Sequence, residues 1–106
     1  MSTLEKVRRL EQYFAADSSS TDPVVDRTIE KLLQREKSRL KMLQTNLNGQ
    51  ITDFENKYNM KSGSFEKRYE SGELGDEIDY IEWSSTLDML KNIEKRLRLL
   101  TGSSDR

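Results

Sequence analysis

PVVDRTIEKLLQREKSRLKMLQTNLNGQITDFENKY, residues 23 to 58, carries one helical apolar pattern from its first turn to its last. When each residue turns the helix by about 100°, the apolar side chains fall within an arc of about 100°. They are Val25, Ile29, Leu32, Leu33, Leu40, Leu43, Leu47, Ile51, Phe54 and Tyr58. The pattern predicts a long amphipathic helix and, through it, an all-α fold.

The middle of this stretch contains a candidate break. TNLNGQ, residues 45 to 50, has the composition of a turn, and Thr52 with Glu55 has the spacing of a capping box. The apolar stripe nevertheless crosses Gly49 without changing phase, at a helix-propensity cost of about 1 kcal/mol. We therefore expect one continuous helix rather than two.

Local signals mark both ends of this helix. Asp22 followed by Pro23 supplies a side-chain cap and a first-turn proline. At the other end Asn59 occupies a position that suits a left-handed residue, a conformation that Asn tolerates better than most residues. The helix is expected to stop at about Tyr58.

Two further helices complete a hairpin. Ser62 can cap a short helix at the bend, which carries Phe65 and Tyr69 one turn apart and closes at Gly72. Asp76 then opens a helix that runs to about residue 100. These elements predict a coiled-coil-like helical hairpin domain over residues 23–100, followed by a disordered tail over residues 101–106.

A separate helix precedes the hairpin. Ser2 or Thr3 can cap it, and its apolar side chains fall mainly on one side. Those side chains are Leu4, Val7, Leu10 and Phe14. DSSSTD then favours a turn or a flexible link, because Ser and Asp side chains compete for backbone hydrogen bonds. The prediction is an N-terminal helix over residues 1–16 and a linker over residues 17–22.

Composition restricts the classes of function. Of 106 residues, 35% are charged and only 33% apolar, so the chain forms one small domain at most. With no Cys and no His, the usual zinc sites, Ser-His and Cys-His nucleophiles and disulfides are excluded. No apolar run approaches the ~18 residues of a membrane span, so we expect a soluble, cytoplasmic protein. The residues indicate no cofactor.

The C-terminal helix is apolar over a wide arc. Its apolar residues are Ile78, Tyr80, Trp83, Leu87, Met89, Leu90, Ile93, Leu97 and Leu100. They spread over roughly 200°, which calls for two neighbouring helices, whereas a hairpin alone offers one. The long helix is also about 18 Å longer than its partner, a length that the N-terminal helix could cover. We therefore expect a homodimer, a bound partner protein, or both.

GELGDEIDYIEW, residues 72 to 83, concentrates carboxylates and two large aromatic side chains. Asp76, Asp79 and Glu82 have the spacing of acidic pairs that hold Mg²⁺ between facing helices. The second cluster that such a site needs is missing, because the apolar face of the long helix offers one carboxylate, Glu36. A metal site is therefore disfavoured.

The same carboxylates have a structural explanation. Asp76 as helix cap, Asp79 at the third helical position and Glu77 beside them would each stabilise the positive end of the helix dipole by about 0.3–1 kcal/mol. That explanation does not cover Glu73 or the aromatic residues. Acidic residues around aromatics are a common interface composition, although a core position is favoured for Trp83. The predicted partner-binding residues are Glu73, Asp76, Glu77, Asp79, Tyr80 and Trp83.

Glu36 falls in the middle of the long helix's apolar arc, where an unpaired charge would be costly. The favoured interpretation is a locally solvated segment, because Arg35, Lys37, Arg39 and Lys41 surround it. The alternative is a register or dimer contact, in which Glu36 faces Arg or Lys of another helix. The basic runs REKSRLK and KRLR are interrupted or isolated, so direct nucleic-acid binding is disfavoured.

The segment from Phe54 to Leu90 resembles a known family. KYNM, the helix from Phe65 to Tyr69, SGELGD, Asp79 and EW are similar to elements of small helical prokaryotic type II antitoxins, which are commonly encoded beside a small toxin gene. DPVVDRTIEKLL is similar to the start of that family's long helix. This sequence departs at residue 59, an Asn where Gly is usual. The resemblance implies a protein partner that is neutralised by direct binding, and no enzymatic activity.

Two functional hypotheses remain open from the sequence. In the first, an antitoxin-like homodimer docks its acidic face on or near a basic active site of a toxin, one that acts on RNA or nucleotides. In the second, the chain is a stand-alone homo-oligomeric bundle with a scaffold role. A Mg²⁺-dependent hydrolase is a third and disfavoured hypothesis.

Overall fold

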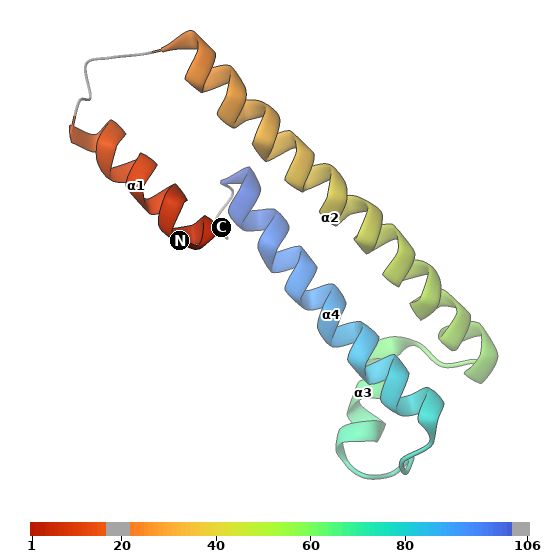
Figure 1. Ribbon diagram of the computed structural model, residues 1–106. Coiled ribbons are helices and arrows are strands. Elements are labelled where there is room, and N and C mark those ends of the chain that lie inside the picture. The colour runs from red at the N-terminus through yellow and green to blue at the C-terminus, as the bar shows by residue number, and fades with distance from the viewer. Residues whose placement is uncertain (17–21, 103–106) are drawn as a thin grey trace. The chain divides into compact units, whose positions relative to one another are not determined.

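The computed structural model describes residues 1–16 and 22–102 of the chain. These residues form four helices and no strand, namely α1 (Thr3–Ala16), α2 (Pro23–Tyr58), α3 (Ser62–Glu70) and α4 (Ile78–Thr101) (Figure 1). The predicted all-α helical hairpin is confirmed. The predicted linker, apart from Asp22, and residues 103–106 of the predicted tail lie outside the described residues. The chain divides into two compact units, Met1–Leu32 and Leu33–Arg106.

α2 is continuous, as its apolar periodicity predicts. Its first turn is capped by Asp22, whose carboxylate accepts a 2.9 Å hydrogen bond from the Val24 backbone N–H. The Thr52 hydroxyl donates to the carbonyl of Asn48 (3.0 Å), so Thr52 sits inside the helix and does not cap a new one. Gly49 meets no other atom within 4 Å of the position that a Cβ would take. The helix tolerates its turn-like centre without a break.

α2 ends as expected at a left-handed asparagine. Asn59 has a φ of 49°, and the Met60 N–H bonds to the Glu55 carbonyl at 3.1 Å. This six-to-one bond is the closing interaction of a Schellman motif, which satisfies a carbonyl of the last turn. The chain thereby reverses within a few residues and enters α3.

The predicted cap of α3 is wrong by one residue. Lys61 occupies the cap position in an extended conformation (φ −75°, ψ 149°), and Ser62 is the first helical residue. The N–H and the hydroxyl of Ser62 both make contacts outside α3. Its N–H donates to a carboxylate oxygen of Glu55 (2.9 Å), and its hydroxyl accepts the indole N–H of Trp83 (3.0 Å).

Gly72 closes α3, as the sequence predicts. It adopts a positive φ of 81°, which a residue with a Cβ rarely takes. Its N–H bonds to the Tyr69 carbonyl (3.1 Å), and the N–H of Glu73 bonds to the Arg68 carbonyl (3.0 Å). The pair of bonds is again a Schellman motif, here with glycine at the left-handed position.

The principal core lies where α2, α3 and α4 meet. Phe65 of α3 and Trp83 of α4 are both 0% exposed, and their rings stack at a centroid distance of 4.0 Å and an angle of 5°. Phe54 of α2 stacks on the other face of the Trp83 indole, with the two ring centroids 5.6 Å apart. Ile51 and Leu87 complete the buried cluster. α3 thus supplies from within the chain one of the two neighbours that α4 requires.

A second buried cluster joins the middle of α2 to the C-terminal half of α4. It consists of Leu40, Leu47 and Ile93, with Leu90, Leu97 and Leu100 packed against it. Figure 1 shows α4 running back beside α2 in the opposite direction. Burial of the α2 stripe is incomplete even within this region, because Leu43, between Leu40 and Leu47 in the sequence, remains 47% exposed.

Among the described residues of the N-terminal unit, 1–16 and 22–32, none is completely buried. In α1 the Ser2 hydroxyl accepts the Glu5 N–H (3.1 Å), while the Glu5 carboxylate accepts the Ser2 N–H (3.2 Å). This reciprocal pair is a capping box, and it selects Ser2 over Thr3 as the cap. The helix ends at Ala16 as predicted. Its apolar residues Leu4, Val7, Leu10 and Phe14 are exposed.

Candidate partner-binding surface

The candidate surface is the connection from α3 to α4 and the first turn of α4. Asp76 does not cap α4, which corrects the prediction. Glu77 is the cap residue, in an extended conformation (φ −64°, ψ 148°), and its carbonyl accepts the N–H groups of Tyr80 (3.0 Å) and Ile81 (3.1 Å). Its side chain makes no capping hydrogen bond. Asp79 is therefore the second helical residue rather than the third.

Three of the predicted carboxylates are exposed at this connection. Asp76 and Glu77 lie on the surface immediately before α4. Glu73 is also exposed, and its carboxylate pairs with the guanidinium of Arg68 on α3. From residue 70 to residue 90 the sequence contains Asp and Glu but no Lys or Arg. The connection itself is therefore acidic, although Arg68 offsets the charge of Glu73 and Lys57 offsets that of Asp79.

Asp79 is partly buried, with 28% of its side chain exposed, and it pairs across the hairpin. One carboxylate oxygen accepts a hydrogen bond from the ammonium of Lys57 (2.6 Å) and another from the hydroxyl of Tyr58 (2.5 Å). These two bonds lower the pKa of Asp79, and the same contacts raise the pKa values of Lys57 and Tyr58. The network fastens the first turn of α4 to the last turn of α2.

Tyr80 is half-buried and contacts aromatic neighbours. Its ring lies 5.2 Å from that of Tyr58 and 5.8 Å from that of Phe65, measured between centroids. It also packs against the principal core. Tyr80 therefore presents only part of its ring to a partner.

Trp83 is a core residue, and its assignment to the partner-binding surface is corrected. It is 0% exposed and sandwiched between Phe54 and Phe65. Its one polar atom is satisfied within the chain by the Ser62 hydroxyl. A partner cannot reach this side chain without opening the core, so Trp83 supports the surface from beneath.

Glu36 forms its ion pairs with residues of its own helix, α2. Its carboxylate pairs with Arg35 (2.6 Å) and with Arg39 (3.4 Å), and its side chain is 34% exposed. Both partners belong to α2, so within the described residues Glu36 makes no ion pair to another helix. This geometry matches the locally solvated segment that the sequence favoured. A dimer contact through Glu36 stays an untested prediction.

Sequence reasoning missed the partners that cross between helices. Lys57 and Tyr58 bind Asp79, and Lys91 on α4 donates to Glu66 on α3 at 2.9 Å. That hydrogen bond raises the pKa of Lys91. One signal was present for the first network, because a basic residue and a tyrosine close α2 while an acidic residue opens α4. Opposite charges at facing helix ends of a hairpin are candidates for pairing.

The described residues contain no group of three or more Asp and Glu side chains placed to hold a metal ion. Within the same residues, no helix combines the length and apolar character of a membrane-spanning segment. Comparison of the chain with family models, curated proteins and solved structures returned no match.

Proposed function

We propose that the chain is a non-enzymatic, antitoxin-like protein-interaction module that neutralises a partner toxin by direct binding. The observation that carries this proposal is the acidic connection before α4, where Glu73, Asp76 and Glu77 are exposed. Directly behind it, the Asp79 network and the buried Trp83 hold the backbone in place. A backbone that is held in place before binding loses less conformational entropy when a partner docks.

The partner that fits this surface is basic. Carboxylates steer and orient positively charged proteins, and here they would occupy positions that phosphates take in the active site of a toxin acting on RNA or nucleotides. The exposed Ile78 beside the carboxylates, 72% accessible, adds an apolar contact. The proposal includes a cytoplasmic homodimer as the binding unit and requires neither metal nor cofactor.

Co-expression with the product of the adjacent gene tests the proposal. We expect the two proteins to co-purify and the chain to relieve the toxicity of its partner. The variant Asp76→Lys with Glu77→Lys should lose both effects. The matched control is Asp53→Lys with Glu94→Lys, which makes the same change of charge at two exposed positions outside the connection. Absence of a complex and of relief with the wild-type chain would refute the proposal.

A stand-alone homo-oligomeric scaffold is a second candidate. The observation that favours it is the set of large apolar side chains left on the surface of α2 and α4, with Met42 74% and Leu99 73% exposed. This candidate predicts a stable assembly in the absence of any other protein. It also predicts that Asp76→Lys with Glu77→Lys leaves the assembly unchanged.

A further inference from the structure

One side of α2 is basic and exposed between residues 27 and 42, and we call this set of residues the basic face. When each residue turns the helix by about 100°, its members fall within an arc of about 160° centred on Lys31. They are Arg27, Thr28, Lys31, Gln34, Arg35, Ser38, Arg39, Lys41 and Met42, all of them exposed. The buried Leu40 lies on the opposite side of the helix, where α2 packs against α4.

The basic face contains five Arg or Lys residues and no Asp or Glu. The acidic residues between positions 24 and 45 lie about 100° or more from Lys31 around the helix. They are Asp26, Glu30 and Glu36. Glu36 pairs with Arg35 and Arg39, whose side chains nevertheless remain 64% and 63% exposed. Glu36 thus interrupts the basic run in the sequence, but in the helix it lies beside the basic face and not within it.

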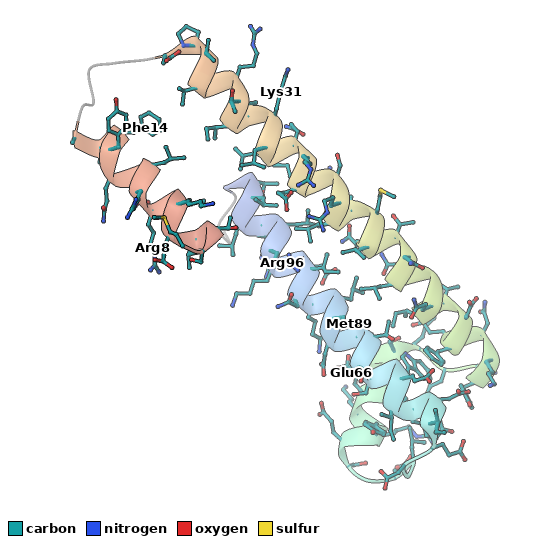
Figure 2. The ribbon with its side chains drawn as sticks, in the orientation of Figure 1. Arg8, Phe14, Lys31, Glu66, Met89 and Arg96 are labelled. Carbon is teal, nitrogen blue, oxygen red and sulfur yellow. The ribbon has the colours of Figure 1, made fainter. Side chains whose placement is uncertain are left out.

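Four of the basic residues form a row with one member per helical turn. They are Arg27, Lys31, Arg35 and Arg39. Successive members are about 6 Å apart along the axis, so the row spans about 18 Å. Figure 2 shows the side chain of Lys31 projecting outward from α2. The phosphates of one strand of duplex DNA follow one another at about 3.4 Å along its axis, so a row of this length lies alongside about five of them.

We propose that the basic face of α2 binds the phosphate backbone of double-helical nucleic acid without reading its sequence. Arg and Lys side chains neutralise phosphates and release the counterions that surround them. The exposed Ser38 between the basic residues adds a hydroxyl group, which is also a common donor to phosphate oxygens. The binding goes beyond the proposed function, because it uses α2 and leaves the acidic connection before α4 available to a toxin.

The composition of the basic face favours this partner over an acidic protein or a single strand. Protein interfaces are enriched in aromatic side chains and depleted in Lys, and single strands are held by bases that stack on aromatic rings. The basic face has no aromatic member, and Met42 is its one large apolar member. Its five charges therefore match a partner that presents a regular line of anionic groups.

Fluorescence anisotropy with a short labelled duplex of arbitrary sequence tests the proposal. The logarithm of the binding constant should fall linearly with the logarithm of the salt concentration, with a slope of about −4 for four to five phosphate contacts. A second duplex of unrelated sequence should bind with the same affinity within about three-fold. The proposal is wrong if the full chain does not bind either duplex at about 50 mM salt, or if it binds one of them with an affinity that salt does not change.

The variant Arg27→Gln with Lys31→Gln removes two charges from the basic face. Its affinity for the duplex should fall about ten-fold or more at about 50 mM salt, and the slope should become shallower by about 2. The matched control is Lys95→Gln with Arg96→Gln, which removes two charges from exposed positions of α4. Because the net charge of the chain changes equally, the control should stay within about two-fold of wild type. Equal losses in the two variants would show that binding follows net charge alone and would overturn the proposal.

Competition distinguishes the duplex from the other anionic partners. Poly-glutamate and an unlabelled single strand, each at the charge concentration of an unlabelled duplex, should displace the labelled duplex less well than the unlabelled duplex does. Equal displacement by poly-glutamate would assign the basic face to an acidic polypeptide, and equal displacement by the single strand would remove the preference for a double helix. Either result contradicts the proposal. Co-purification with a toxin is a separate measurement, so its outcome does not bear on the basic face.

Discussion

Asp79 shows why a residue's role depends on what faces it. By sequence it is one carboxylate among several near a helix start, and any of them suits that position. In the structure it is the one that accepts hydrogen bonds from Lys57 and Tyr58, 22 and 21 residues earlier in the chain. No local pattern contains that information, because it depends on how two helix ends meet.

The Asp79 network makes stability depend on pH at both extremes. The pKa of Asp79 is lowered by folding, so its contribution is present above its ordinary value of 3.8 and is lost as the pH falls through the lower folded value. The pKa of Tyr58 is raised, so its contribution is present below 10.0 and is lost as the pH rises through the folded value. The pKa of Lys57, raised from 10.5, has the same sign.

The corresponding prediction compares wild type with Asp79→Asn in chemical denaturation at several pH values. The wild type should be the more stable protein between about pH 5 and pH 9. The difference should shrink toward zero in acid and again in strong alkali. A difference that is the same at pH 2.5 and pH 7 would show that Asp79 acts through shape rather than charge.

Ser62 provides a second test at the scale of one residue. Ser62→Ala removes the acceptor of the buried Trp83 N–H and should cost about 1–2 kcal/mol in the free energy of unfolding. In a Trp83→Phe background the same substitution should cost much less. Ser64→Ala, at an exposed position of the same helix, is the control. Equal costs in the two backgrounds would argue against the hydrogen bond.

At the scale of helices, local signals located most boundaries. Asp22 before Pro23, Asn59 and Gly72 each act through their own conformation or side chain, and the structure places all three as the sequence predicts. At the two misplaced caps, the residue in the cap position, Lys61 or Glu77, makes no side-chain capping hydrogen bond, so no local signal marks it. Ser62 forms hydrogen bonds with Glu55 and Trp83 instead of capping α3. Glu77, next to Asp76, occupies the cap position of α4.

Gly49 tests the continuity of α2. It lies inside the helix with no atom close to the position of a new Cβ, so Gly49→Ala should stabilise the protein by about 1 kcal/mol. Gly75, with a φ of 80°, is the matched control, and Gly75→Ala should destabilise because a Cβ strains that conformation. Thermal melting followed by circular dichroism measures both. Destabilisation by Gly49→Ala would indicate that α2 bends at this point.

At the scale of the whole molecule, burial is concentrated in two clusters while much apolar surface stays open. Phe65 and Trp83 are completely buried, yet Ile78, Met42 and Leu99 are each more than 70% exposed. The sequence indicated a surplus of apolar surface through the wide arc of α4. It could not indicate which part α3 would cover, because that depends on tertiary packing.

The central claim is that this chain acts by binding other polypeptide chains, including a copy of itself. Multi-angle light scattering on the purified chain, alone and mixed with the adjacent gene's product, measures this most directly. The account predicts twice the mass of one chain for the protein alone and a heavier stoichiometric complex for the mixture. A folded species of 12.4 kDa in both samples would contradict it.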